Sequence, residues 1–332
     1  MKKYKVLKIS IVLSLVLVCF NSGGNICDCN AGPVKRSSAR IIAVMPFVNQ
    51  TGNKNISWLG PGVADSLSSK LSAVEDLVVV ERAQISSIVR EKELGMTGLI
   101  DEAHAPKLGK MLGARILVLG SFAGIKASGK IMLRFNCKIV DTETGRIIGG
   151  GGVRAKGSLD SIFNMEEKIA EDITKRIGIV LTGAEKRYLK LPASSSVTAY
   201  ELYSLALDEQ DYSRKKKLLL RAISYDKKFA RAHLSLGYVL YGLSSMEGES
   251  PELVTHLNTA VRIDPRLIEA NYILGSYYDR LSRMDETGSQ LNRKNAVSHY
   301  KKYVEQAERS PLRTVMKRVK RSRKRIGALS GD

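Results

Sequence analysis

The sequence predicts an N-terminal α/β domain, with a mixed sheet and flanking helices, followed by an all-α helical solenoid. Apolar runs of strand length alternate with helical patterns over residues 39–182, which is typical of an α/β domain. After a linker at 183–197 only helical patterns remain, and one of them is repeated within 198–310. The chain has 332 residues, 44% of them hydrophobic, which is enough for two cores because domains usually contain roughly 100–200 residues.

The α/β domain is predicted to begin with a strand at Ile41–Phe47, a continuous apolar run that ends at a polar turn. The next segments alternate: a helix at 63–71, a strand at 77–80, helical stripes at 85–89 and 103–112, and a strand at 115–122. Lys130–Asp141 alternates strictly, as in a half-buried strand, with one apolar face made of Ile131, Leu133, Phe135, Cys137 and Ile139. A turn at Asp141–Gly145 and an amphipathic helix from Leu159 to about Leu181 complete the domain.

No catalytic, cofactor-binding or metal-ligating set is predicted. Gly124–Lys130 has the spacing of a phosphate-binding loop, but Ile131 replaces the hydroxyl that binds magnesium, and a strand follows instead of a helix. This segment is therefore expected to be a hairpin turn. Glu81 and Arg82 have no accompanying base or nucleophile and are expected to be ion-paired or to cap a helix. The histidines are expected to be structural or exposed: His104, His233, His256 and His299.

Three short motifs in the first domain carry a family resemblance. A strand ends in Pro46-Phe47, an Asn-x-Thr-Gly turn follows at Asn49–Gly52, and a second strand ends in Val80-Glu-Arg82. In this order, the motifs resemble the curli-assembly (CsgG-like) and flagellar outer-membrane-associated family of periplasmic α/β domains, over about a third of the chain. The resemblance implies a place in the cell envelope, where such a domain self-associates or docks on an envelope complex.

Pore-forming members of that family add transmembrane hairpins to this domain. Residues 115–157 have room only for the three strands that the sheet itself needs, because each membrane-crossing strand takes about 9–11 residues. The strand count therefore argues against a pore.

The N-terminus predicts export. Four lysines precede the apolar stretch Ile9–Phe20, which is much shorter than the roughly 20 residues needed to span a bilayer. Residues 1–31 are therefore interpreted as a signal peptide, cleaved after Ala31, with a destination in the periplasm or on the periplasmic face of the outer membrane. Lipidation at Cys19 is the alternative, and the bulky Val18 before it makes it the less favoured one. Cleavage would leave Cys137 as the one cysteine of the mature chain.

The C-terminal region contains an internal repeat. Ala222–Asp226, Ala232 and Leu236-Gly237 return 38 positions later as Ala260–Asp264, Ala270 and Leu274-Gly275, and a degenerate third copy spans Tyr300–Pro311. This pattern resembles the tetratricopeptide repeat (TPR), whose period is about 34 residues. The resemblance implies that a concave face binds a segment of another protein, and it assigns four positions to that face: Arg231, Tyr238, Tyr272 and Asp279.

The chain ends in a basic segment at 311–332, predicted to be a capping helix and tail because apolar residues recur at helical spacing from Leu312 to Val319. Its cations are Arg313, Lys317, Arg318, Lys320, Arg321, Arg323, Lys324 and Arg325. They form either the solvated outer face of the last repeat or a surface for anionic lipid, lipopolysaccharide or an acidic partner. Nucleic acid is not expected as a partner despite the net charge of +20, because the chain is predicted to be exported and has no recognition motif.

These patterns together favour a non-enzymatic envelope protein that scaffolds assembly or secretion of a surface structure and binds protein partners through its repeats. The alternative is a basic protein whose C-terminal tail binds an anionic surface.

Overall fold

The computed structural model describes residues 40–91, 104–127, 129–247, 250–284, 289–308 and 310–330. The predicted signal peptide, its cleavage after Ala31 and lipidation at Cys19 lie outside the described residues. Residues Ser38–Asp332 form one compact unit, which contains the α/β region and the C-terminal helices.

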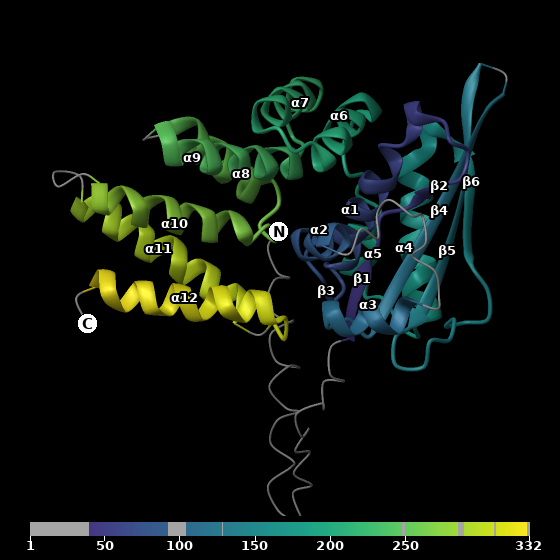
Figure 1. The fold of residues 1–332 in the computed structure, drawn as a ribbon, viewed down its shortest axis with the longest axis horizontal. Coiled ribbons are helices and arrows are strands. Elements are labelled where there is room, and N and C mark those ends of the chain that lie inside the picture. The colour runs from purple at the N-terminus through teal and green to yellow at the C-terminus, as the bar shows by residue number, and fades with distance from the viewer. Residues whose placement is uncertain are drawn as a thin grey trace, which may run out of the picture. The chain divides into compact units, whose positions relative to one another are not determined.

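The α/β region contains a mixed sheet, as the sequence predicts (Figure 1). Its strands are β1 (Arg40–Val44), β2 (Val48–Asn49), β3 (Leu77–Val79), β4 (Ile116–Ala127), β5 (Lys130–Asp141) and β6 (Val153–Ser158). They follow the order β3-β1-β4-β5-β6, and β2 pairs with β4. The strands from β3 to β4 are parallel, whereas β4, β5 and β6 are antiparallel.

Helices cover both faces of the sheet. These helices are α1 (Leu59–Leu71), α2 (Arg82–Glu91), α3 (Ala105–Leu112) and α4 (Ile162–Arg176), with short 3-10 turns at Lys54–Ile56 and Leu159–Ser161. Leu67 of α1 and Ile169 of α4 share one core with the apolar face of β5. Leu108 of α3 and Ile85 of α2 belong to a second core on the other face. The predicted apolar face of β5 is buried at Leu133, Phe135, Cys137 and Ile139, because this face meets the first core.

Local backbone chemistry sets several boundaries. The predicted strand at Ile41–Phe47 divides into β1 and β2 around Pro46, which has no N–H to donate to a ladder. The Gly124–Lys130 segment belongs to a hairpin as expected, but Gly124–Ala127 still forms the end of β4, so the turn itself is shorter; Ala127 is opposite Lys130 and Gly129 has φ +75°. Helix α4 ends at Arg176, earlier than the predicted Leu181, because Gly178 at φ +75° takes the left-handed conformation that terminates helices.

The segment expected to be a linker contains helix α5 (Gly183–Leu189). Thr182 and Glu185 form a capping box that starts this helix, which explains why a polar segment is helical here. Lys70 of α1 donates hydrogen bonds from Nζ to the carbonyl oxygens of Leu189 and Leu191, both at 2.6 Å. These bonds fix the end of α5 against the α/β region.

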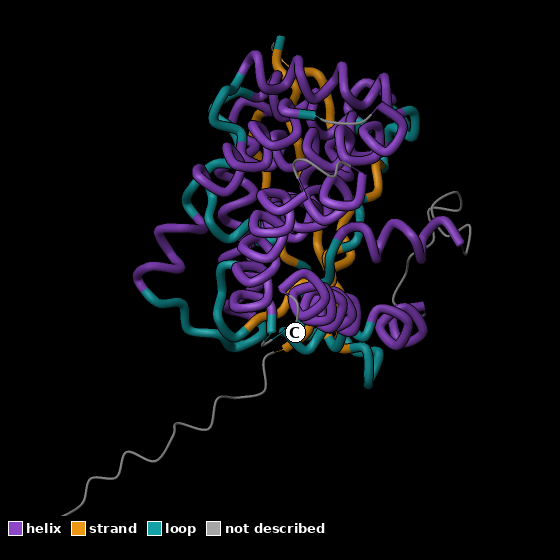
Figure 2. Tube along the Cα trace, turned by 90° about the vertical axis from the view of Figure 1, so that its left-hand side faces the viewer, coloured by secondary structure: helices purple, strands orange, loops and turns teal. Residues whose placement is uncertain are grey.

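The C-terminal region consists of α-helices joined by short loops, which Figure 2 shows as purple coils and teal connections. They are α6 (Val197–Asp208), α7 (Tyr212–Tyr225), α8 (Ala230–Glu247), α9 (Pro251–Ile263), α10 (Glu269–Met284), α11 (Ser289–Ala307) and α12 (Arg313–Ser330). Each helix packs against the next one in the chain. In the described part of the chain, none of the helices has the length and apolar character needed to cross a membrane.

The 38-residue sequence repeat corresponds to repeated packing. Asp226 and Asp264 are the C-caps of α7 and α9, and each accepts a hydrogen bond from the backbone N–H two residues later. Gly237 of α8 lies so close to Leu257 that an added Cβ would stand 2.2 Å from its side chain. At the equivalent Gly275 of α10, an added Cβ would stand 2.7 Å from the Tyr300 ring. Glycine at these equivalent positions lets each helix approach its partner closely.

Candidate functional site

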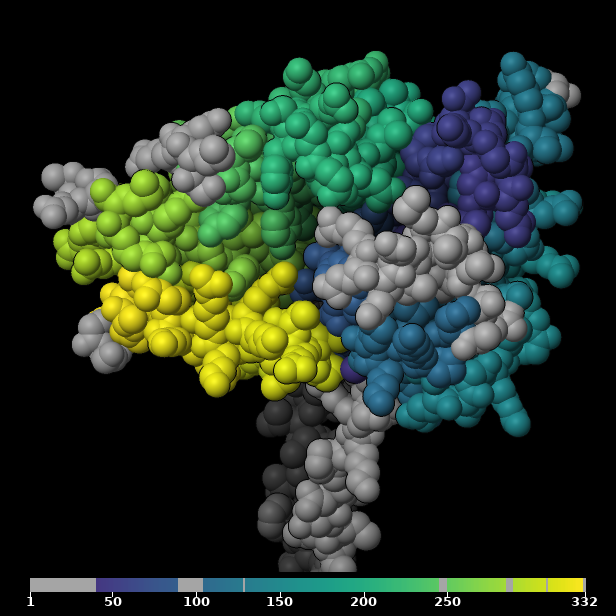
Figure 3. Space-filling model, in the orientation of Figure 1, coloured from purple at the N-terminus to yellow at the C-terminus, as the bar shows by residue number. Residues whose placement is uncertain are grey.

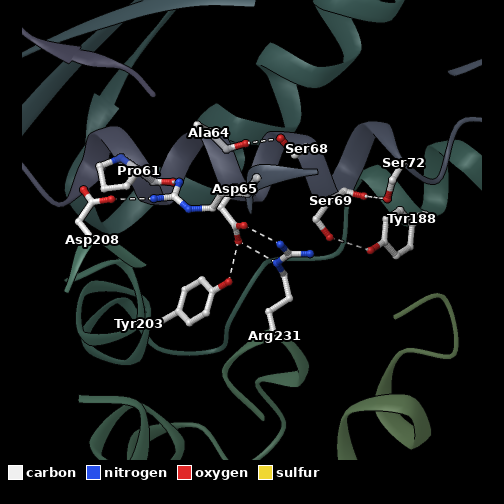
Figure 4. Close-up of polar contacts among 11 residues, drawn as sticks. Pro61, Ala64, Asp65, Ser68, Ser69, Ser72, Tyr188, Tyr203, Asp208 and Arg231 are labelled. Carbon is white, nitrogen blue, oxygen red and sulfur yellow. Dashed lines mark hydrogen bonds and ion pairs between the residues drawn. The ribbon is translucent and has the colours of Figure 1, made fainter. Parts of the chain in front are cut away.

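Polar and charged side chains connect the α/β region with the C-terminal helices. We call this set of contacts the junction, and define it by Asp65, Glu81 and Arg82 on one side and by Tyr203, Asp208, Arg231 and Arg318 on the other. Figure 4 shows its centre, where Asp65 of α1 faces Tyr203 of α6 and Arg231 of α8. Asp65 lies on a helix that is buried on more than one side, because α1 packs against the sheet, α4 and α6, so the fold places its carboxylate inside the protein.

The Asp65 carboxylate is 3% exposed and is fully hydrogen-bonded. Arg231 donates from Nε to Oδ2 at 2.7 Å and from Nη2 to Oδ1 at 2.5 Å, and the Tyr203 hydroxyl donates to Oδ2 at 2.8 Å. Burial acts to raise the pKa of Asp65, but the charge and hydrogen bonds of Arg231, with smaller contributions from Arg82 and Tyr203, hold this pKa below its ordinary value. The ionised pair is therefore the stable state at neutral pH.

Two further ion pairs flank this centre. Arg82 at the start of α2 donates to the carbonyl of Pro61 and to Oδ1 of Asp208, the last residue of α6, at 3.2 and 2.8 Å. Glu81 accepts from Arg318 of α12 at 2.9 Å. Glu81 and Arg82 are thus both ion-paired. Arg82 pairs with α6, the first helix of the C-terminal region, and Glu81 pairs with α12, the last.

A buried carboxyl group lies beside the junction. Glu166 of α4 is fully buried and accepts hydrogen bonds from Ser66 Oγ at 2.5 Å and from the Tyr200 hydroxyl at 2.6 Å. Burial raises the pKa of Glu166 to about 7, against the opposing effects of the two hydrogen bonds and of Lys70. This group therefore changes its protonation state near neutral pH without contact with solvent.

The four residues that the TPR resemblance assigned to a binding face have different surroundings. Arg231 bonds to Asp65, and Asp279 is buried and accepts from Arg325 of α12 through both carboxylate oxygens at 2.6 and 2.7 Å. Tyr272 packs against the Tyr303 ring at 5.2 Å between centroids. Tyr238 is 41% exposed. Of these four residues, Tyr238 offers the largest exposed surface to a partner, and Arg231 and Asp279 use their charges within the chain.

The predicted basic segment forms α12, and one side of this helix is buried. Leu312, Val315 and Val319 belong to the second core, next to Ile85 of α2. Arg318 and Arg325 are half-buried and bond to Glu81 and Asp279, and Arg323 bonds to Glu308 at 2.7 Å. The exposed side carries a row of cations that we call the α12 stripe: Arg313, Lys317, Lys320, Arg321 and Lys324. Figure 3 shows α12 (yellow) open to solvent along its length.

Three of the four histidines make polar contacts among the C-terminal helices. His233 and His256 meet through their Nδ1 atoms at 2.8 Å, and Nδ1 of His299 lies 3.0 Å from Oδ1 of Asn271. Burial lowers the pKa of each, to about 4 for His299. Within the described ranges, no group of three or more His, Cys, Asp or Glu side chains is arranged to hold a metal ion.

The sequence did not reveal the junction acids Asp65 and Asp208. Their partners lie 166 and 126 positions away, so no local spacing connects them. No local signal marks Asp65 either, because it lies on the side of its helix opposite to the apolar stripe of Val63 and Leu67, where the sequence alone predicts exposure.

Part of the chain matches a known protein family. Residues 27–129 match the model of CsgG, the curli production assembly/transport component. A protein of Rhizobium meliloti (strain 1021) named "Putative adenylate cyclase 3" is 23% identical over 257 residues, which cover 74% of this chain. The chain spans 41% of the length of that relative.

Similar solved structures include three bacterial proteins. The C-terminal domain of LpoB from Salmonella enterica is 20% identical and covers 37% of this chain and 83% of its own, with a TM-score of 0.25. Lipoprotein GNA1162 from Neisseria meningitidis is 17% identical and covers 42% and 97%, with a TM-score of 0.29. The hypothetical protein CT253 from Chlamydia trachomatis is 15% identical and covers 45% and 98%, also with a TM-score of 0.29.

Proposed function

We propose that this chain is an exported, non-enzymatic envelope protein in the periplasm or at the outer membrane. Its CsgG-like domain scaffolds the assembly or secretion of a surface structure, and its TPR-like helices bind a protein partner. The repeated helix packing carries the partner-binding part of the proposal. Equivalent aspartate caps and glycine contacts recur 38 residues apart, as in an array of helix pairs.

The match of residues 27–129 to the curli assembly and transport family supports the envelope part of the proposal. The lysine-rich start and the short apolar stretch at Ile9–Phe20 support export. The cyclase activity in the relative's name is not part of the proposal, because this chain spans only 41% of that protein.

Export is tested by expressing the chain with its own N-terminus and identifying the mature N-terminus by mass spectrometry, with and without globomycin, an inhibitor of lipoprotein signal peptidase. A start at Gly32 in the periplasmic fraction supports a free periplasmic scaffold. A globomycin-sensitive chain lipidated at Cys19 supports the outer-membrane form. An uncleaved cytoplasmic chain contradicts both.

Partner binding is tested with a photo-crosslinking amino acid placed at Tyr238 in cells of the organism that makes the protein. Tyr225 of α7 is the matched control, because it is a tyrosine with 56% exposure on another helix. We expect a discrete crosslinked protein from position 238 and none of the same size from position 225. Equal products from both positions would exclude a specific partner on this face.

The α12 stripe favours a second candidate function, the binding of an anionic surface. Five exposed cations on one side of a helix give a continuous positive surface, and each basic residue near an anionic bilayer contributes about 1 kcal/mol. Deleting the helix would remove Val315 and Val319 and uncover the second core that they pack against, so charge removal is the cleaner test.

The test measures co-sedimentation with vesicles that contain phosphatidylglycerol. R313Q/K317Q/K320Q/R321Q/K324Q should abolish binding, and R214Q/K217Q/R221Q/K227Q/K228Q, which removes the same number of exposed cations elsewhere, should retain it. Equal loss in the two variants would indicate a response to net charge alone.

A further inference from the structure

A groove on the sheet is surrounded by cations that the junction and the α12 stripe do not use. It has a volume of about 750 Å³ and is lined by Arg134 and Asn136 of β5, Arg154, Ala155 and Lys156 of β6, and Lys168 of α4. The four cations take part in no hydrogen bond or ion pair among the described residues, although such contacts occupy many other basic side chains of the chain.

The groove follows the open edge of the sheet. Strand β6 ends the strand order and pairs only with β5 in the described part of the chain. Successive residues of a strand point to opposite faces, so Ala155 lies on the face opposite to Arg154 and Lys156. Ala155 is buried on the side of α4, whereas its two neighbours are exposed. Because the groove is lined by residues from both faces of β6, it must include the outer edge of that strand.

The arrangement of these charges destabilises the protein when no ligand occupies the groove. Arg134 is directly opposite Lys156 in the β5–β6 register, and like charges in directly opposed cross-strand positions are destabilising. Asn136 is opposite Arg154 and adds an amide donor to the same face. A single lysine on an edge strand protects it from aggregation, but that role does not require an arginine on the neighbouring strand or a lysine on α4.

An extended acidic segment of a partner protein fits this edge. Its backbone would continue the sheet about 4.8 Å beyond β6, and alternate carboxylates would lie on the same face as Arg154, Lys156 and Arg134. The side chains in between would face α4 and Lys168. A second copy of this chain fits less well, because two β6 edges would bring the same cations together in a protein of net charge +20.

We propose that the β6 edge is a docking site for an extended acidic peptide segment, which joins the sheet as an added strand. The proposal is independent of the proposed function, since it uses neither the helical repeats nor the α12 stripe.

The test uses the full chain and a fluorescein-labelled peptide of about ten residues that alternates threonine and glutamate, the length of a typical strand. Binding is measured by fluorescence anisotropy at low ionic strength. The comparison is the same peptide with every backbone nitrogen methylated, which leaves no N–H to donate on either edge of the strand. We expect the unmethylated threonine peptide to bind at least about tenfold more tightly, since it alone can donate ladder hydrogen bonds.

Two variants on different elements test the residues. R134Q/R154Q/K156Q, on the face of the glutamates, should weaken binding by at least about tenfold, whereas K168Q on α4, which faces the threonines, should weaken it less. The control R214Q/K217Q/R221Q removes three exposed cations of α7 and should bind as the unmodified protein does. Circular dichroism confirms that each variant is folded.

Three results would overturn the proposal. Equal affinity for the two peptides would mean attraction by charge without strand addition. Unchanged binding in both groove variants would place the peptide elsewhere. Binding of phosphatidylglycerol vesicles that is lost in the triple variant, with no binding of the threonine peptide, would assign the groove to a membrane surface.

Discussion

Arg231 holds the carboxylate of Asp65 through two hydrogen bonds of 2.5 and 2.7 Å, although the residues are 166 positions apart. The pair joins the second residue of α8 to the centre of α1, and Tyr203 of α6 donates to the same carboxylate. Three elements from two regions of the chain therefore depend on one buried charge.

We expect Arg231→Ala to lower the free energy of unfolding by about 3–5 kcal/mol, because it leaves the Asp65 charge buried without a partner. The control Lys216→Ala breaks the more exposed Lys216–Glu252 pair and should change stability by less than about 1 kcal/mol. Urea denaturation measures both. The double variant D65N/R231Q should lose less than Arg231→Ala; a larger loss would show that the pair is not the origin of the effect.

Gly275→Ala and Gly237→Ala should each destabilise the protein by about 1–3 kcal/mol, because the added methyl group meets Tyr300 or Leu257 at far less than contact distance. Gly327→Ala in α12 is the matched control, with no atom within 4 Å of the added Cβ. Since alanine favours a helix by about 1 kcal/mol over glycine, the control should be stabilised. Thermal unfolding compares the three, and a shift of the same sign in all would contradict close helix approach at the first two sites.

The stability of the protein should depend on Glu166 between pH 4.5 and about 7. The pKa of this group is about 7 in the folded protein and 4.5 in the unfolded chain, so the unfolded chain releases the proton first as pH rises. The contribution of Glu166 is thus complete below pH 4.5 and is lost as pH rises through about 7. Glu166→Gln should remove this decline. By pH 7 the free energy of unfolding of this variant should have gained on the order of 3 kcal/mol relative to that of the unmodified protein.

Urea titrations at several pH values measure that difference. Glu305→Gln, which alters an exposed glutamate of α11, should run parallel to the unmodified protein. A constant gap between Glu166→Gln and the unmodified protein across the range would refute the assignment.

Cys137 should be unreactive in the folded protein. Its side chain is fully buried, so a reagent cannot reach the sulfur. Burial also raises the pKa of the thiol to about 12, so almost none of it is the reactive thiolate at neutral pH. In a variant with serine at positions 19, 27 and 29, Ellman's reagent should react at once in guanidinium chloride and at least about a thousandfold more slowly in buffer. Fast reaction in buffer would mean that β5 opens readily.

Much of the α/β fold was predictable because its signals are local. The alternation of Lys130–Asp141 identified four of the residues that β5 buries, Leu133, Phe135, Cys137 and Ile139, since a strand with one buried face has a period of two. Val140 was missed, because it is buried on the opposite face, in the second core. The end of α4 was missed because the positive φ of Gly178 depends on the chain around it. The 38-residue repeat was visible as a pattern in sequence, and the structure gives it equivalent caps and glycine contacts.

The site was less predictable, because it depends on pairing across long separations. Arg231 and Asp279 were selected as binding residues from their helical positions, and a sequence does not reveal that Asp65 and Arg325 reach them. The groove cations are spread over β5, β6 and α4, so only the strand register brings Arg134 next to Lys156.

The contact of α12 with α2 constrains the order of folding. Glu81 and Arg318 are 237 positions apart, and the second core contains Val315 and Val319 of α12 together with Leu312 just before that helix. During synthesis the N-terminal half emerges first, so the apolar surface of α2 stays uncovered until nearly the whole chain has been made. A ribosome that stops before α12, or a protease that removes it, would release a chain with an open core, a substrate for chaperones and degradation.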